Sequence, residues 1–128
     1  MPYTINRLIA GIPFDDVDSR TRAALAANGF GVLTEIDVAA TMKKKIGVEM
    51  SPYRILGACN PQMAHQAIGI EPRVGAMLPC NVILRTVEGG VEVSAIDPVA
   101  SMQAIDNPGL QVLAAQVRDL LARAVADI

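Results

Sequence analysis

The sequence predicts an α+β domain in which helices pack on one side of a largely antiparallel sheet of about five strands. Short segments rich in β-branched residues alternate with segments of helical periodicity along the 128-residue chain. The segments at 80–87 and 91–96 are joined only by Glu88-Gly89-Gly90, so they must form an antiparallel hairpin, which disfavours a doubly wound parallel sheet. Apolar residues make up 52% of the chain and aromatic residues only 3%, so we expect a single domain, residues 1–128, with an aliphatic core.

The first strand is expected over residues 3–9, which carry β-branched and aromatic side chains and end before Gly11. A helix follows and ends at Asn28-Gly29, because glycine tolerates the left-handed conformation at a helix end. Its first turn holds three carboxylates that favour the dipole of the helix: Asp15, Asp16 and Asp18. Its apolar stripe consists of Val17, Ala24 and Leu25.

The next segment alternates between apolar and polar residues over 30–36, which predicts a second strand. Asp37 is a suitable N-cap for a short helix over 38–46 that ends at Gly47. Residues 52–59 form the third predicted strand.

Asn60-Pro61 is a typical helix start, since asparagine caps free amides and proline lacks only a donor that would have no partner there. This helix is expected to run to about Gly69. A loop rich in proline and glycine over 71–79 then leads to the hairpin.

The chain ends in helical segments. Asp97-Pro98 opens a short one, and Asn107-Pro108 repeats the pairing of cap and proline before a final helix over about 109–126. Apolar residues recur in it at three- and four-residue spacing: Leu110, Leu113, Val117, Leu120, Leu121 and Ala124.

Charge, apolar stretches and cysteine content limit the partners and the location that we expect. The formal net charge of −2 disfavours nucleic-acid binding, and the one basic run, Lys43-Lys44-Lys45, fits the end of a predicted helix. No apolar stretch reaches the length of about 18 residues that a membrane span needs, and we expect no signal peptide. With only two cysteines, a reducing cytoplasm is the natural location.

The segment ACNPQMAHQAI, residues 58–68, brings a thiol, a thioether and the single histidine close together in sequence. At about 100° per residue, however, Met63 and His65 point in nearly opposite directions on a regular helix. Met63 falls on the core-facing arc with Ala64, Ala67, Ile68 and Ile70. We therefore expect Met63 in the core and His65 at the solvent edge.

Three interpretations of Cys59 and Cys80 stay open. Both can be buried structural residues, because free cysteine is among the most buried residue types. Cys59 precedes a helix start, where amide dipoles favour thiolate, so a redox role is an alternative. If their strands are neighbours, Cys59 and Cys80 with His65 form a candidate site for a soft metal or a haem contact.

Catalytic constellations are sparse. Any scheme that needs a histidine must use His65, and no glycine-rich phosphate loop is present. The sequence leaves open whether the protein is an enzyme and which cofactor, if any, it uses; it favours a non-catalytic role.

Several of these motifs together resemble the family named domain of unknown function 302, from about Tyr3 to Met102. They are Asn28-Gly29-Phe30-Gly31-Val32-Leu33, Ile36-Asp37, Cys59-Asn60-Pro61, Leu78-Pro79-Cys80, the Gly89-Gly90 turn and Asp97-Pro98. The resemblance implies a small domain of bacterial type, with a curved antiparallel sheet of the TATA-binding-protein-like class, and it implies homodimers. It implies no activity. The helix over about 108–126 extends beyond the family core at 3–102 and is a candidate for dimer contacts.

The leading hypothesis is a non-catalytic, cytoplasmic homodimer that binds a small molecule or a soft metal, or serves as an accessory module. The rival is a thiol-dependent redox protein or enzyme that uses Cys59 or Cys80, with His65 as base.

Overall fold

The computed structural model describes residues 2–128. Its strands are β1 (Thr4–Ile9), β2 (Gly31–Asp37), β3 (Tyr53–Cys59), β4 (Cys80–Val87) and β5 (Gly90–Ile96). Its helices are α1 (Phe14–Ala27), α2 (Val38–Ile46), α3 (Pro61–Ile70), α4 (Pro98–Ser101) and α5 (Pro108–Ala126), with a 3₁₀ helix η1 (Pro72–Met77).

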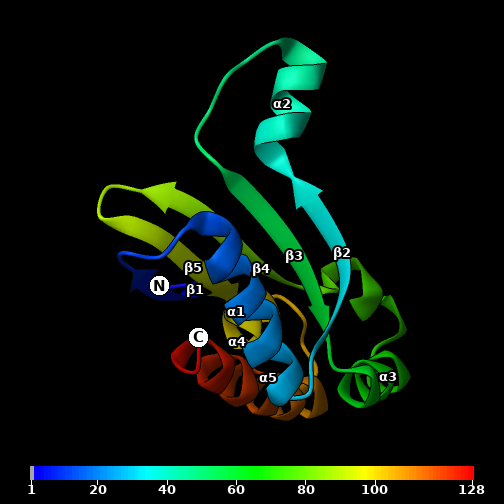
Figure 1. Ribbon diagram of the computed structural model, residues 1–128. Helices are drawn as coiled ribbons and strands as arrows, with labels where there is room; N and C mark the ends of the chain where they lie inside the picture. The colour runs from blue at the N-terminus through cyan, green and yellow to red at the C-terminus, as the bar shows by residue number, and fades with distance from the viewer. Residues whose placement is uncertain (1) are drawn as a thin grey trace.

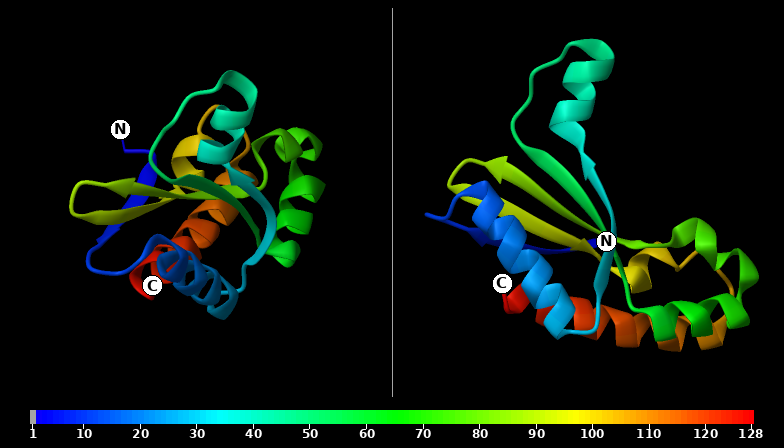
Figure 2. Two further views of the ribbon diagram at one scale, coloured as in Figure 1. Left: turned by 45° about the horizontal axis from the view of Figure 1, so that its top comes forward. Right: turned by 45° about the vertical axis from the view of Figure 1, so that its right-hand side comes forward.

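The strands form one open sheet in the order β1-β5-β4-β3-β2, and every neighbouring pair is antiparallel. Helices α1 and α5 lie side by side against one face of this curved sheet (Figures 1 and 2). The α+β class predicted from the sequence is therefore confirmed. Within residues 2–128, no helix has the length and apolarity needed to cross a membrane.

The core is aliphatic, as the composition requires. Buried side chains on the helix-covered face of the sheet, such as Leu56 and Leu84, pack with Val17 of α1 and Leu121 of α5. A second cluster of buried residues lies around α3, η1 and the first half of α5, and includes Val74, Met102, Leu110 and Leu113.

Side-chain caps begin four helices where the sequence predicts them. Asp37 accepts a hydrogen bond from the Ala40 amide at 2.9 Å, and Asn60 accepts one from the Met63 amide at 3.1 Å. Asp97 and Asn107 cap α4 and α5 in the same way. These bonds satisfy amides that have no partner within the helix, so the caps fix where each helix starts.

Arg7 of β1 ties the sheet to the end of α5. One nitrogen of its guanidinium donates to the carbonyls of Val125, Ala126 and Ile128, at 3.2, 2.8 and 2.8 Å respectively. The last carbonyls of a helix lack partners within it, and a cation there is favourable. This contact holds the carboxyl-terminal helix against the edge strand.

Two sequence expectations need correction. Residues 71–79 are predicted as a loop, whereas residues 72–77 form η1, because the Val74 amide donates to the Glu71 carbonyl and the Val74 side chain is buried. Helical periodicity also places Ile68 and Ile70 on the core-facing arc, yet both side chains are exposed. Ala67 is the only buried residue of α3.

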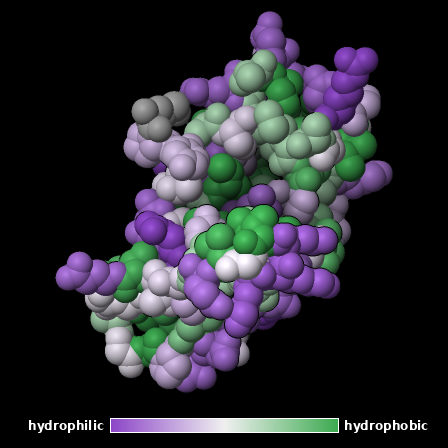
Figure 3. All heavy atoms as spheres, turned by 90° about the horizontal axis from the view of Figure 1, so that it is seen from above, coloured by the Kyte–Doolittle hydropathy of each residue, from purple (hydrophilic) through white to green (hydrophobic). Residues whose placement is uncertain are grey.

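Helix α2 and residues 47–52 together form an extension that we call the arm. The arm stands away from the rest of the molecule beyond the ends of β2 and β3 (Figure 1). No residue of α2 is buried, and Ile46 is 66% exposed. Apolar and hydrophilic side chains lie next to one another on this end of the molecule (Figure 3). Helices of globular proteins usually bury one apolar face against another element, and α2 buries none within one chain.

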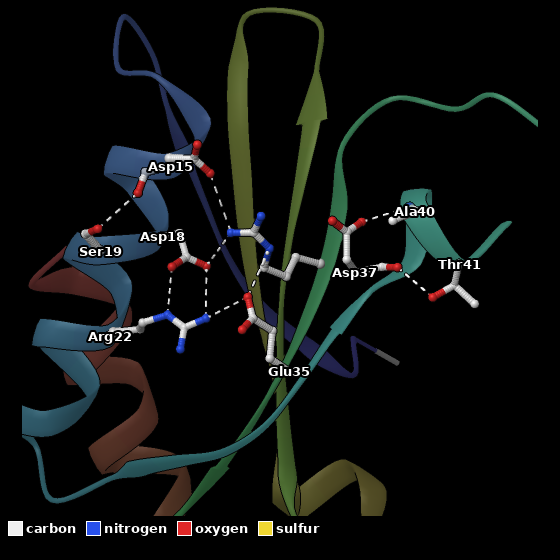
Figure 4. A network of polar contacts seen from close by, with 9 residues as sticks. Asp15, Asp18, Ser19, Arg22, Glu35, Asp37, Ala40 and Thr41 are labelled. Carbon is white, nitrogen blue, oxygen red and sulfur yellow. Dashed lines mark hydrogen bonds and ion pairs between the residues drawn. The ribbon is translucent and has the colours of Figure 1, made fainter. Parts of the chain in front are cut away.

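A network of ion pairs fastens α1 to β2 and β3 (Figure 4). The buried Asp18 carboxylate accepts a hydrogen bond from Arg22 at 2.7 Å and one from Arg54 at 3.0 Å. Arg22 also pairs with Glu35 of β2 at 3.0 Å, and the Arg54 guanidinium lies 5.0 Å from the centre of the Phe14 ring. Asp18 is therefore a bridge between elements, and the dipole interaction expected from the sequence does not describe its main role.

Burial alone would raise the pKa of Asp18, but the hydrogen bonds and charges of Arg22 and Arg54 outweigh it, so the pKa lies below its ordinary value. A lowered pKa in the folded state stabilises the fold above the unfolded-state pKa. That stability is lost as the pH falls through the folded-state value.

We expect Asp18→Asn to lower the free energy of unfolding at pH 7 by about 2 kcal/mol, because the half-buried Arg54 would lose its hydrogen-bonded carboxylate and keep only the longer contacts with Glu35 at 3.4 Å and Asp15 at 3.7 Å. Urea denaturation measures this value. Asp16→Asn, which changes an exposed carboxylate of the same helical turn, is the matched control and should be nearly neutral. The difference between wild type and Asp18→Asn should shrink as the pH falls below about 4. A difference that does not change with pH would contradict the role of the Asp18 charge.

Candidate functional site

A small apolar cavity of about 40 Å³ lies where the end of β3 and the start of β4 meet α3 and α5. It sits at the junction of the two core clusters, because its wall includes members of both. Its lining residues are Phe30, Ala58, Cys59, Asn60, Met63, Ala64, Ala67, Leu78, Pro79, Cys80, Pro98, Met102, Leu110, Leu113, Ala114 and Val117.

The pairing of β3 with β4 brings the two cysteines to this wall. Ala58 lies directly opposite Cys80 in the antiparallel register, and Cys59 is the last residue of β3. Since Cys80 is the first residue of β4, both thiols lie at the same end of the sheet. The condition set by the sequence, that the two strands be neighbours, is met.

Helix α3 closes the cavity from the side. Its direction is set at Asn60, whose side chain caps it, and at Pro61, which occupies the first helical position. Met63 and Ala64, and Ala67 one helical turn later, then line the cavity. The strand-to-helix junction therefore also builds the site.

Gly57 allows Pro79 to approach β3 closely. A Cβ atom added at Gly57 would lie 2.7 Å from Cγ of Pro79 and would collide with the side chain of Thr34. Real Cβ contacts are not this short, so a larger residue would displace one of these neighbours. The missing side chain thus leaves room for Pro79, the residue before Cys80.

The wall offers few polar groups and an unusual amount of sulfur. Asn60 contributes the only side-chain amide, and its oxygen is occupied by the Met63 amide. Both cysteines of the chain belong to the lining of the cavity, together with Met63 and Met102. The sequence places Met63 in the core but gives no role to Met102, which reaches the cavity only through tertiary packing.

Cys80 is a neutral thiol at ordinary pH. Burial raises its pKa to about 11, and the neighbouring Cys59 acts in the same direction. Cys80 is only 7% exposed, whereas Cys59 is half-buried. Both thiols are free. A thiol that keeps its proton is a poor nucleophile, so Cys80 is not arranged for thiolate chemistry on its own.

His65 lies apart from this cavity. It is exposed on α3 and is absent from the lining, in agreement with the helical geometry that separates it from Met63. The structure therefore brings together two of the three predicted metal-site residues, Cys59 and Cys80. Within residues 2–128, no group of three or more histidine, cysteine, aspartate or glutamate residues is placed to hold a metal ion.

The raised pKa of Cys80 gives a test at alkaline pH. A thiol whose folded-state pKa exceeds its unfolded value of about 9.0 contributes stability that is fully present below pH 9. That stability is lost as the pH rises toward 11. We expect the free energy of unfolding of the wild type to fall by about 2 kcal/mol over this range relative to Cys80→Val. The Cys59→Ala variant should retain the fall, and parallel curves for wild type and Cys80→Val would contradict it.

Comparisons with known proteins agree with this architecture. A crystal structure described as the uncharacterized conserved protein DUF302 from Bacillus stearothermophilus matches with a TM-score of 0.93. The two chains are 24% identical, and the match covers 99% of this chain and 98% of that one, which shows a shared fold. No curated protein matches the chain. The sequence also matches the family described as "Domain of unknown function DUF302" over residues 7–128, and the chain therefore belongs to this family.

Proposed function

We propose that the protein is a non-catalytic module that binds a small apolar ligand or a soft metal in the cavity beside Cys59 and Cys80. The observation that carries this proposal is the composition of the cavity wall, which combines aliphatic residues with four sulfur-containing residues. Binding sites for small ligands are typically concave and mainly apolar, with a few polar groups that fix orientation.

The same wall supports a role without catalysis. It contains no carboxylate, imidazole or ammonium group that could transfer a proton, and the buried Cys80 retains its own. General acid-base chemistry needs such a group within hydrogen-bond reach of the substrate. A ligand in this cavity would therefore be held and not transformed.

The competing function is a thiol-dependent redox protein or enzyme that uses Cys59 or Cys80, with His65 as base. One observation favours it, since the two thiols share a cavity. The exposed position of His65 outside the lining and the raised pKa of Cys80 weigh against it. We therefore rank it second.

We further propose that the protein is a cytoplasmic homodimer with a fold of the TATA-binding-protein-like class. Two free thiols suit a reducing compartment. The arm supports a second copy, because α2 has no buried residue in one chain and leaves Ile46, Val48 and Met50 exposed. Packing against a partner would bury these side chains. The net charge of −2 favours protein or small-molecule partners over nucleic acid.

The binding proposal predicts that occupancy of the cavity stabilises the fold. In the first experiment, reduced protein is titrated with Cu⁺ or Zn²⁺ in the absence of oxygen, and thermal unfolding measures the change in stability. In the second, dissolved xenon is added to the protein, and ¹²⁹Xe NMR detects its binding. We expect at least one probe to bind, with about 2.7 kcal/mol of stabilisation for a metal at one hundred times its Kd. Ala64→Leu, which fills the cavity, should weaken binding, and Ala115→Leu on the exposed side of α5 should not. The absence of binding by all three probes would contradict the proposal.

The dimer proposal predicts a mass of two chains by light scattering. Because the arm is expected at the interface, Ile46→Glu should shift the protein toward one chain. Val112→Glu changes an equally exposed apolar residue of α5 and should leave the dimer intact. Dissociation by Val112→Glu instead would move the interface to the final helix, and a wild-type mass of one chain would contradict dimerisation.

A further inference from the structure

We propose that the cavity is a Cu⁺ site whose ligands are the sulfur atoms of Cys59, Cys80, Met63 and Met102. The inference rests on the proposed function and narrows it to one class of ligand, a soft monovalent metal ion. It also replaces His65 in the predicted ligand set with two thioethers.

The first support is the concentration of sulfur. The chain has two cysteines and six methionines, and both cysteines and two of the methionines line this one cavity. They come from four separate places in the fold: the end of β3, the start of β4, α3 and the residue that follows α4. Cys59 and Met63 are four residues apart in the sequence, whereas Cys80 and Met102 join them in the cavity lining only through folding.

The second support is the chemistry of the available donors. Thiolate and thioether ligands are soft and suit Cu⁺, whereas carboxylate, carbonyl and water ligands suit harder cations. The cavity wall has no carboxylate or imidazole, and the side-chain oxygen of Asn60 already accepts the cap hydrogen bond of α3. A metal that enters would therefore find sulfur as its main side-chain ligand. Structural zinc sites use four thiolate or imidazole ligands, and this wall has two cysteines and no histidine.

The third support is size. A volume of about 40 Å³ is far below the roughly 300–1,000 Å³ of pockets that hold organic cofactors. It is enough for a single ion with its ligands already in the wall. A haem, which the sequence also leaves open, would require the two core clusters to separate. The dimensions thus favour an ion.

Binding of Cu⁺ would release protons from the thiols and would leave the oxidation state of copper unchanged. Two thiols and one Cu⁺ would give a bis-thiolate complex of net charge −1, with two protons released to solvent and copper remaining Cu⁺. The thioethers of Met63 and Met102 would donate without any change in charge. Helix α3 begins immediately after Cys59-Asn60, so the positive end of its dipole lies beside the complex and offsets part of the charge.

The test is competition for Cu⁺ against a colorimetric Cu⁺ chelator without oxygen, with copper per chain measured by elemental analysis. We expect one Cu⁺ per wild-type chain and a loss of this site in Cys59→Ala. The double variant Met63→Leu with Met102→Leu keeps the volume of the wall but removes both thioethers, so it should fold. It should bind Cu⁺ about tenfold or more weakly. Thermal unfolding of the metal-free variants checks their fold.

Two control variants test whether the affinity for Cu⁺ depends on these four sulfur atoms. Met50→Leu removes a thioether from the arm, and His65→Asn removes the imidazole of α3; neither should change the affinity. A loss of affinity in His65→Asn equal to that in Cys59→Ala would overturn the proposed ligand set. Equal affinity in the wild type and the double methionine variant would do the same.

The copper inference and the binding proposal can fail separately. If xenon or Zn²⁺ occupies the cavity while Cu⁺ does not bind, the copper inference is overturned and the binding module stands. If none of these probes binds, both are overturned.

Discussion

The antiparallel register between β3 and β4 is the constraint on which the candidate site depends. It places Ala58 opposite Cys80 and leaves Cys59 at the adjoining strand end, and both cysteines belong to the lining of the cavity. Everything else around the cavity follows from that pairing. Asn60 can start α3 only where β3 stops, and Pro79 can pack against β3 only because Gly57 has no side chain. A slip of one residue would turn Cys80 to the other face of the sheet.

The structure divides its polar and apolar interactions between two regions. Asp18, Arg22 and Arg54 join α1 to the sheet away from the cavity, where a buried carboxylate is matched by two guanidinium groups. Around the cavity, by contrast, apolar contacts between α3, α5 and the strand ends hold the wall. Charge is thus kept away from the sulfur atoms, and the cavity is a place where a soft ligand would meet little competition from water.

The sequence predicts those features that depend on neighbouring residues. The caps at Asp37, Asn60 and Asn107 and the hairpin turn follow from local hydrogen bonding and backbone preference, and the structure confirms them. The pairing of Asp18 with Arg54 spans 36 residues and requires the packing of α1 on β3, so no local rule predicts it. Met102 joins the cavity wall for the same kind of reason. Periodicity shows that Ile68 and Ile70 are apolar on one arc of α3, but it does not say whether another element covers them.

The central claim is that folding gathers four sulfur atoms into one soft ligand set, and the coordination of bound copper tests it most directly. X-ray absorption at the copper edge of the reduced, Cu⁺-loaded protein reports the elements that surround the ion. We expect a first shell of sulfur alone, from Cys59 and Cys80 with the thioethers of Met63 and Met102. A shell that contains nitrogen, as binding through His65 would give, would contradict the claim.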